Sequence, residues 1–358
     1  MNSYHLTDIL EGLVHQGTLP DRDQIKYLLD LSTAKDLNRL FKAARQVRNK
    51  FFGNKIFLYG FLYFSTHCRN SCNFCQYRQT NDKIPRYRKT EDQILRAARE
   101  MADAGVHLID LTMGEDPELY ASGNAGFKGL VKIVQKVREA TGLPVMISPG
   151  AIPDTILEDL SRADAAWFAC YQETHNRILY QTLRKNQDFD SRLNKKKLAK
   201  NLGMLIEEGI LTGVGESLDD LAESILWMKD FSVDQARVMT FVPQKDTPMA
   251  HLQFQDTIKE QIIIAVMRLV LGDVLIPATL DVDGLDGLTA RLDAGANVVT
   301  SIVPPENGLA GVANLSLDIE ESRRTLDQIL PVMKRCNLAP ATQEEYIAWI
   351  SNRKTGRN

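Results

Sequence analysis

Short apolar runs alternate with longer amphipathic segments from residue 56 to residue 335, and this alternation constrains the fold most strongly. The runs are rich in β-branched and aromatic residues, whereas the segments between them carry apolar residues at helical spacing. The predicted strands cover residues 56–64, 107–112, 144–148, 165–171, 209–214, 235–241, 275–280 and 296–302. The predicted helices cover residues 90–104, 125–140, 153–163, 194–208, 217–230, 255–271, 284–293 and 317–335. Eight such units predict an α/β fold with a parallel sheet, a (βα)8 TIM-type barrel, with incomplete closure as an alternative.

The first 54 residues have a different pattern, in which apolar residues recur at helical spacing without an intervening strand. One predicted helical face carries Leu6, Ile9, Leu10 and Leu13. We therefore expect three parts: an N-terminal helical extension (1–54), the barrel (55–340), and a C-terminal helix with a basic tail (341–358). The extension is interpreted as a cap over the bottom of the barrel.

The composition restricts the class of protein. A hydrophobic content of 44% over 358 residues is enough for a large core. The net charge of −3, without a basic block, predicts neither nucleic acid nor a membrane as a partner. No apolar run approaches the ~18–20 residues of a membrane span, and the first residues lack the pattern of a secretory signal. Five cysteines are a sparse and odd set for a disulfide framework, so a cytoplasmic location is expected.

Three of the five cysteines, Cys68, Cys72 and Cys75, fall within eight residues with the spacing Cys-x3-Cys-x2-Cys. Thiolates this close can converge on one metal centre. A four-iron cluster normally takes four thiolates, so three leave one iron open to a ligand that is not protein. A zinc site or a redox-active thiol cluster is the alternative, although His67 adjoins Cys68 too closely to complete a zinc site readily.

The cysteine spacing, followed by an aromatic residue, resembles the signature of the radical S-adenosylmethionine (SAM) enzymes. This resemblance implies one [4Fe–4S] cluster per chain and SAM as cofactors, together with a low-potential electron donor. It also implies that Phe74 and Tyr77 shield the cluster and border the adenine of SAM. Simple packing of the loop is an alternative role for both aromatic residues.

Polar residues occur at the end of every predicted strand, where the active sites of such barrels lie. SAM is a zwitterion with a ribose, so its carboxylate favours a guanidinium and its hydroxyl groups favour a carboxylate. The candidate SAM-binding residues on this reasoning are Ser148, Glu173, Arg184 and Arg192. Met113-Gly114-Glu115 resembles the short Gly-Glu motif that receives the SAM amine in radical SAM enzymes, which implies a SAM-binding role for Glu115. Each of them also has an alternative role as a cap or turn residue.

A second polar set comprises Asp110, Arg237, Thr279 and Asp281, from three predicted strands. One guanidinium and two carboxylates complement a ligand with one carboxylate and two ammonium groups, as in a basic amino acid. The alternative is an interior ion pair that only supports the barrel.

Long blocks of the chain resemble the methylornithine synthases of pyrrolysine biosynthesis, which are radical SAM enzymes of the biotin-synthase-like group. The blocks cover residues 47–49, 52–54, 63–66, 86–88, 110–117, 146–150, 171–174, 208–215, 237–241, 292–297 and 300–302. The resemblance implies isomerisation of L-lysine to 3-methylornithine, with Asp110, Arg237, Thr279 and Asp281 binding the amino acid. It assigns no side chain to the radical step, since the radical is generated on SAM. Thr279 is a mild departure, because the family can carry Ser there.

Two other functions are also compatible with the sequence. Another single-cluster enzyme of the biotin synthase and hydrogenase maturase group would act on a different small amino acid. Biotin synthase needs further cysteines for a second cluster, whereas Cys170 and Cys336 are expected to be inert core residues here. A carrier or sensor of iron–sulfur clusters is the non-enzymatic alternative.

Overall fold

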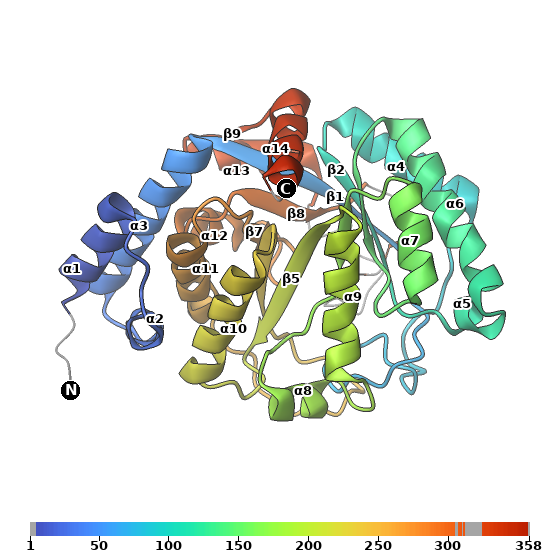
Figure 1. Ribbon diagram of the computed structural model, residues 1–358, viewed down its shortest axis with the longest axis horizontal. Helices are drawn as coiled ribbons and strands as arrows, with labels where there is room; N and C mark the ends of the chain where they lie inside the picture. Colours follow the sequence, from blue (N-terminus) through green and yellow to red (C-terminus); the bar gives the residue numbers. More distant parts are fainter. Residues whose placement is uncertain (1–4, 305–306, 310, 312–323, 357–358) are drawn as a thin grey trace.

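Eight parallel strands form the centre of the protein, shown as a computed structural model in Figure 1. The structure describes residues 5–304, 307–309, 311 and 324–356. The strands are β1 (Lys55–Ser65), β2 (Leu108–Met113), β3 (Val145–Ser148), β4 (Trp167–Ala169), β5 (Leu205–Thr212), β6 (Gln235–Thr240), β7 (Pro277–Thr279) and β8 (Val298–Ile302). Their order is β6-β5-β4-β3-β2-β1-β8-β7. A single parallel bridge, Gln235 to Leu275, joins β6 to the segment before β7. The predicted (βα)8 barrel is therefore confirmed, with closure that is only just complete.

Helices surround the sheet on its outer face and precede it in the chain (Figure 1). Before the barrel lie α1 (Leu6–Glu11), the π-helical turn η1 (Gly12–Gln16), α2 (Arg22–Leu29) and α3 (Ala34–Phe52). Within it lie α4 (Glu91–Ala104), α5 (Pro117–Ala121), α6 (Asn124–Thr141), α7 (Asp154–Arg162), α8 (Arg177–Leu183), α9 (Phe189–Asn201), α10 (Leu218–Phe231), α11 (Ile258–Leu271), α12 (Leu288–Asp293) and α13 (Leu326–Arg335). The short strand β9 (Ala339–Pro340) pairs with β1, and α14 (Gln343–Thr355) follows.

The first strand shows how the sequence pattern produces the barrel. Alternate side chains of β1 point to opposite faces of the sheet. One apolar cluster inside the barrel takes up Phe57, Tyr59, Phe61 and Tyr63, whereas Leu58, Leu62 and Phe64 pack in the larger cluster under the helices. Because both faces are buried, this strand is continuously apolar rather than alternating.

Strand register carries two polar side chains toward the interior of the barrel. Asp110 of β2 pairs with Phe61 of β1, and Thr112 pairs with Tyr63. Residues at the same level of a parallel sheet share a face, so Asp110 and Thr112 point inward with these aromatic rings. Thr112 is also level with Ser148 of β3.

The structure corrects the predicted boundary between residues 194–208 and the strand that follows. Helix α9 ends at Asn201, and β5 begins at Leu205, four residues before the predicted start of the strand. Gly203 has a φ of +86°, which ends the helical segment. Adjacent Glu207 and Glu208 resemble a solvent-exposed helix surface in the sequence, yet both are fully buried strand residues. Residues 317–323 of the last predicted helix lie outside the described residues, and α13 starts at Leu326.

The C-terminal helix covers one end of the barrel. Figure 1 shows α14 across the end that lies away from α8. The hydroxyl groups of Tyr346 and Tyr59 are 2.7 Å apart, and Trp349 stacks on Trp167 at a centroid distance of 5.9 Å. Tyr59 and Trp167 lie at the amino-terminal side of the sheet, so α14 closes the end opposite to the one where active sites form.

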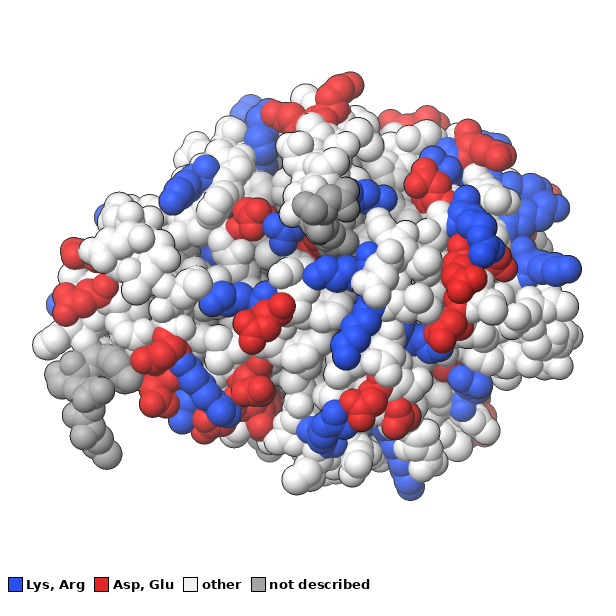
Figure 2. Space-filling model, in the orientation of Figure 1, with Lys and Arg blue, Asp and Glu red and all other residues white. Residues whose placement is uncertain are grey.

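Charged side chains of both signs are interspersed over the face of the molecule in Figure 2. In the parts of the chain that the structure describes, no helix combines the length and the apolar character needed to cross a membrane.

Tyr346→Ala should lower the free energy of unfolding by roughly 3–5 kcal/mol, because it empties a fully buried aromatic site and removes the bond to Tyr59. Ile347→Ala on the same helix is the control, since that side chain is 43% exposed and should change stability by about 0.5 kcal/mol or less. Urea unfolding of both variants measures the difference. Equal effects would show that α14 contributes no specific closure of the barrel.

Candidate active site

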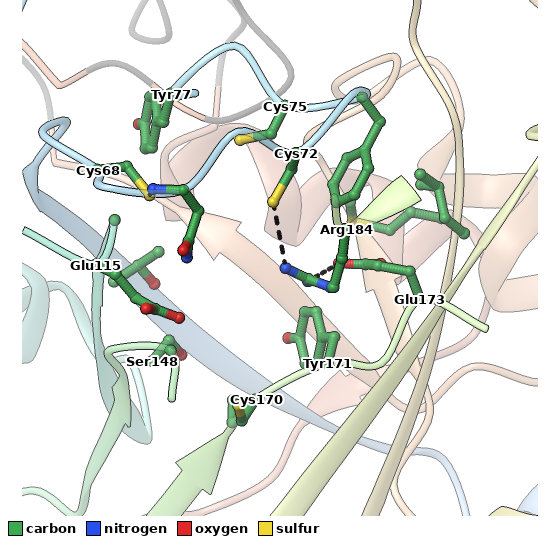
Figure 3. A pocket seen from close by; sticks show the side chains of 18 of the residues that line it. Cys68, Cys72, Cys75, Tyr77, Glu115, Ser148, Cys170, Tyr171, Glu173 and Arg184 are labelled. Atoms are coloured by element: carbon green, nitrogen blue, oxygen red, sulfur yellow. Dashed lines mark hydrogen bonds and ion pairs between the residues drawn. The ribbon is translucent and has the colours of Figure 1, made fainter. Parts of the chain in front are cut away.

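A cavity of about 220 Å³ opens at the carboxyl ends of the strands, where Figure 3 shows its lining side chains. One wall is the loop after β1, and the others follow β2 to β6. The lining includes Cys68, Asn70, Cys72, Phe74, Cys75, Tyr77, Thr112, Met113, Gly114, Glu115, Ser148, Gly150, Cys170, Tyr171, Glu173, Arg184, Arg192, Met239, Phe241 and Gln244. The cavity therefore brings the three predicted metal ligands and polar strand-end residues to one place.

Main-chain contacts hold the cysteine loop, residues 66–81, against the rest of the site. The Arg69 amide donates to the Glu115 carbonyl at 2.8 Å, and the Asn73 amide donates to the Leu183 carbonyl at 2.8 Å. Gly114 is needed for this approach, because a Cβ atom there would lie 2.4 Å from the carbonyl oxygen of His67. The loop is thus fixed to β2 on one side and to α8 on the other.

The three thiols suit a metal cluster by their environment as well as their spacing. Burial raises the pKa of Cys68 to about 11, and burial together with the neighbouring thiols raises the pKa of Cys75 further. Deprotonated sulfurs therefore need compensating positive charge, which iron supplies. Cys72 Sγ also accepts from Gln187 Nε2 at 3.0 Å, and Arg184 Nη1 lies 3.6 Å from it. Such donors are common around cluster sulfurs.

The three thiols lie on one wall of the cavity without meeting at a single point. In the described part of the chain, no three His, Cys, Asp or Glu side chains converge on a position for a single metal ion. All five cysteines are free thiols. Cys170 was expected to be an inert core residue; it is buried, but it also lines the cavity, whereas Cys336 is half-buried beside α13.

All seven residues predicted to bind SAM line this cavity: Phe74, Tyr77, Glu115, Ser148, Glu173, Arg184 and Arg192. Their charges form pairs. Glu115 lies 3.4 Å from Arg192 and 3.1 Å from Arg69, and Glu173 lies 2.5 Å from Arg184. A wall of alternating carboxylates and guanidinium groups complements a zwitterionic ligand. These residues therefore fit SAM, and their individual roles stay predictions.

The pKa values of the two carboxylates of this wall, Glu115 and Glu173, shift in opposite directions. Burial favours the protonated form of Glu115, but Arg192, the Ala151 amide and Arg69 together lower its pKa. Burial dominates at Glu173, so its pKa is raised despite the ion pair with Arg184. Removing Arg184 would therefore favour protonation of Glu173.

Glu173 has a left-handed backbone with a φ of +69°, which costs energy for a residue other than glycine. Main-chain bonds hold it there: its amide donates to the Gly209 carbonyl at 3.1 Å, and its carbonyl accepts from the Leu211 amide at 2.9 Å. The preceding Gln172 amide donates to Glu208 at 2.7 Å. The conformation therefore depends on β5, which is anchored by a buried ion pair between Glu208 and Lys196.

The four residues predicted to bind the substrate lie behind this cavity, in the interior of the barrel, and do not line it. Asp110 Oδ1 accepts from Ser148 Oγ at 2.9 Å and from Thr112 Oγ1 at 3.1 Å, and both hydroxyl groups belong to the lining. Arg237 is linked to the cavity through Glu207, which accepts from Arg237 Nε at 2.8 Å and from Tyr171 Oη at 2.7 Å. One layer of side chains separates the two sites.

Asp281 and Thr279 lie in a network that the sequence did not indicate. Asp281 Oδ1 accepts from Arg324 Nη1 at 2.8 Å and from Tyr63 Oη at 2.9 Å. Its Oδ2 accepts from Ser301 Oγ at 2.6 Å and from Thr279 Oγ1 at 3.3 Å. The negative charge of Asp281 is therefore already neutralised by Arg324.

Glu207 and Arg324 are the charged residues that sequence reasoning missed. No local signal identifies Arg324, because it is 43 residues from its partner Asp281. Glu207 could have been found from strand periodicity, since it stands two residues before Gly209, the β5 partner of Arg237.

Asp110 is the interior carboxylate that lacks a cationic partner among the described residues. Burial and repulsion from Glu207 raise its pKa to about 7, against the hydroxyl donors and Arg237. Arg237 has an unsatisfied donor, because its buried Nη2 has no hydrogen-bond partner among the described residues. A donor and an acceptor group are thus both left for a ligand.

Comparisons with known proteins agree with this geometry. Residues 62–228 match the Radical SAM superfamily. The 3-methylornithine synthase of Methanosarcina acetivorans is 43% identical over 336 residues, which are 94% of each chain. The [FeFe] hydrogenase maturase subunit HydE of Thermotoga maritima is 31% identical over 78% of this chain and 79% of its own. A crystal structure of methylornithine synthase (PylB) superposes with a TM-score of 0.89 and 41% identity, covering 95% of this chain and 99% of that one.

Gly114→Ala should displace His67 and Cys68, because the added methyl group collides with the cysteine loop. We expect the iron bound per chain after anaerobic reconstitution to fall by at least about half, with a loss of roughly 1–3 kcal/mol in stability. Gly129→Ala is the control, since the new methyl group points into open space on α6. Full iron binding by Gly114→Ala would refute the close approach.

Proposed function

Because this chain belongs to the radical SAM superfamily and, within it, to the 3-methylornithine synthase family, we propose that it isomerises L-lysine to 3-methylornithine. The observation that carries the proposal is the interior of the barrel, where an unpaired carboxylate and an incompletely bonded guanidinium lie directly behind the cavity. Radical SAM enzymes use a [4Fe–4S] cluster and SAM.

Cys68, Cys72 and Cys75 are proposed to hold the cluster, which leaves one iron open for SAM. When bound, the cluster and SAM together supply the deoxyadenosyl radical that removes a hydrogen atom from the substrate. Glu115, Glu173, Arg184 and Arg192 would bind and orient the charged groups of SAM, while Phe74, Tyr77 and Ser148 border it. The electron donor is a separate low-potential partner.

Arg237 is proposed to bind the lysine carboxylate. Its Nε donates to Glu207 and its Nη1 donates to Thr300 Oγ1 at 3.1 Å, so the plane of the guanidinium is fixed. The remaining Nη2 is buried and unpartnered. An unsatisfied buried donor is costly, and a carboxylate bound there would remove that cost.

Asp110 is proposed to bind one of the two ammonium groups of lysine, with Asp281 and Thr279 contacting the other. The described interior charges are those of Arg237, Arg324, Glu207 and Asp281, which sum to zero when Asp110 is protonated. Lysine adds a net charge of about +1. Ionisation of Asp110 on binding would restore neutrality, so substrate binding and proton release are coupled in this proposal.

Closure of the barrel supports a reaction in which a carbon chain breaks and rejoins. Fragments must not escape between these steps. Helix α14 and the aromatic residues of β1 fill the amino-terminal end of the barrel, which blocks the escape of fragments on the side opposite to the cofactor cavity. Binding both ends of the substrate serves the same purpose.

We also propose that the enzyme works in a reducing compartment, the cytoplasm. Cluster ligation requires Cys68, Cys72 and Cys75 as thiolates, and an oxidising compartment would favour their oxidation.

Anaerobic incubation of reduced enzyme with SAM and lysine tests the function directly. We expect deoxyadenosine and an amino acid of the same mass as lysine, separated by chromatography and identified by its fragmentation as 3-methylornithine. Cys72→Ala should form neither product. Deoxyadenosine without the lysine isomer would reject lysine as the substrate and leave the family membership intact.

Lysine binding should release about half a proton per chain at pH 7 and a larger fraction at lower pH, because the ammonium group favours ionised Asp110. Affinity should therefore rise with pH and level off above about pH 8. Calorimetry in buffers of different ionisation enthalpy measures the release. Asp110→Asn should remove it and weaken lysine binding at least about tenfold.

Asp110→Asn should weaken lysine binding but stabilise the folded protein. The folded pKa of Asp110 lies above its unfolded value of about 3.9, so this carboxyl group stabilises the wild type least above pH 7. Asp110→Asn should therefore raise the melting temperature relative to wild type more at pH 8 than at pH 5. Asp103→Asn, an exposed change on α4, is the control. A pH-independent difference would contradict the assigned ionisation.

A further inference from the structure

The segment after the cysteine loop turns back alongside the end of β1. The Thr66 amide donates to the Tyr87 carbonyl at 3.1 Å, and the Lys89 amide donates to the Phe64 carbonyl at 2.8 Å. Ser65 and Arg88 form an antiparallel bridge between these two contacts. Arg86 is thereby placed beside the base of the cysteine loop.

The Arg86 guanidinium binds four backbone carbonyl groups. Nη1 donates to the carbonyls of Thr66 and, at 3.0 Å, Tyr77. Nη2 donates to the carbonyls of Arg78 at 2.7 Å and Asn81 at 2.8 Å. Thr66 stands two residues before the first cysteine, and Tyr77 stands two residues after the third. One side chain therefore ties the two ends of the metal-binding loop together.

All of these acceptors are neutral, so the charge of Arg86 is not compensated by a carboxylate among the described residues. Neighbouring cations differ in this respect: Arg88 pairs with Asp116 at 2.7 Å, and Arg184 pairs with Glu173 at 2.5 Å. The guanidinium bonds to main-chain carbonyls two residues from Cys68 and two residues from Cys75, so its charge lies near both thiols. An arginine in this setting stays charged at neutral pH.

We propose that Arg86 is a positioning residue that closes the cysteine loop and raises the reduction potential of the cluster which that loop holds. The fork of a guanidinium can bind several carbonyl groups at once, whereas an ammonium group of lysine cannot span the same set. A positive charge near cluster sulfurs favours the reduced state, because net charge and hydrogen bonding set the potential. The proposal rests on the cluster assignment in the proposed function and is independent of the identity of the substrate.

Arg86→Lys and Arg86→Gln separate the two effects, since Lys keeps the charge without the fork and Gln keeps neither. Lys83→Gln is the control, because this exposed lysine lies two residues after the cysteine loop and pairs with Asp82 at 3.7 Å. Iron and sulfide per chain are measured after anaerobic reconstitution. The midpoint potential is measured by a redox titration followed by electron paramagnetic resonance, without SAM or lysine.

Arg86→Gln should lower the potential so that the ratio of reduced to oxidised cluster falls at least tenfold at the wild-type midpoint, which is a shift of about 59 mV for one electron. Arg86→Lys should keep a potential near that of the wild type and lose at least half of its iron. Hydrogen exchange of the iron-free variants should be faster in residues 66–81 and unchanged in the strands. Lys83→Gln should match the wild type throughout.

The outcomes distinguish the parts of the proposal. A wild-type potential in Arg86→Gln overturns the charge effect, and full iron with unchanged exchange in both variants overturns the loop closure. A potential in Arg86→Lys as low as that in Arg86→Gln assigns the shift to the lost fork and overturns the charge effect. Absence of a cluster from the wild type itself would instead reject the proposed function.

Discussion

The buried ion pair between Glu207 and Arg237 is the interaction on which the interior of the barrel depends. Both side chains are at most 2% exposed, and each charge alone would be costly in that setting. Glu207 also fixes Tyr171, a lining residue of the cavity, so one carboxylate connects the deeper interior with the cofactor site. Burial and, after it, the same carboxylate raise the pKa of Asp110, so ionisation of that residue is favoured only when a cation binds beside it. Glu207 of β5 therefore contributes to both the structure and the electrostatics of the two sites.

Adjacent residues of β5 serve opposite faces of the sheet. Glu207 points into the barrel, whereas Glu208 points outward to Lys196 of α9, and both pairs are completely buried. Through Gln172, the outer pair supports the strained backbone of Glu173 at the cavity. Two consecutive glutamates thus support two different layers of the site, which explains why this strand tolerates charge in a fully buried position.

The repeating pattern of strands and helices was sufficient to predict the barrel, and the cysteine spacing was sufficient to locate the cavity. Residues that line it were predictable because they follow strands, and parallel strands end on one face. The network around Asp281 was not predictable, since Arg324 approaches from a distant part of the chain. The start of β5 was predicted wrongly because burial of Glu207 and Glu208 depends on cations that only the folded chain brings near.

The hydrogen bonding between neighbouring strands is not equal around the barrel. Neighbouring strands elsewhere share ladders, whereas β6 meets the segment before β7 through the single bridge of Gln235 and Leu275. A lone bridge joins two strands by fewer hydrogen bonds than a ladder does, so this seam is the weakest strand junction among the described residues. The seam lies between β6 and β7, whereas the cysteine loop follows β1, which is separated from β7 by β8.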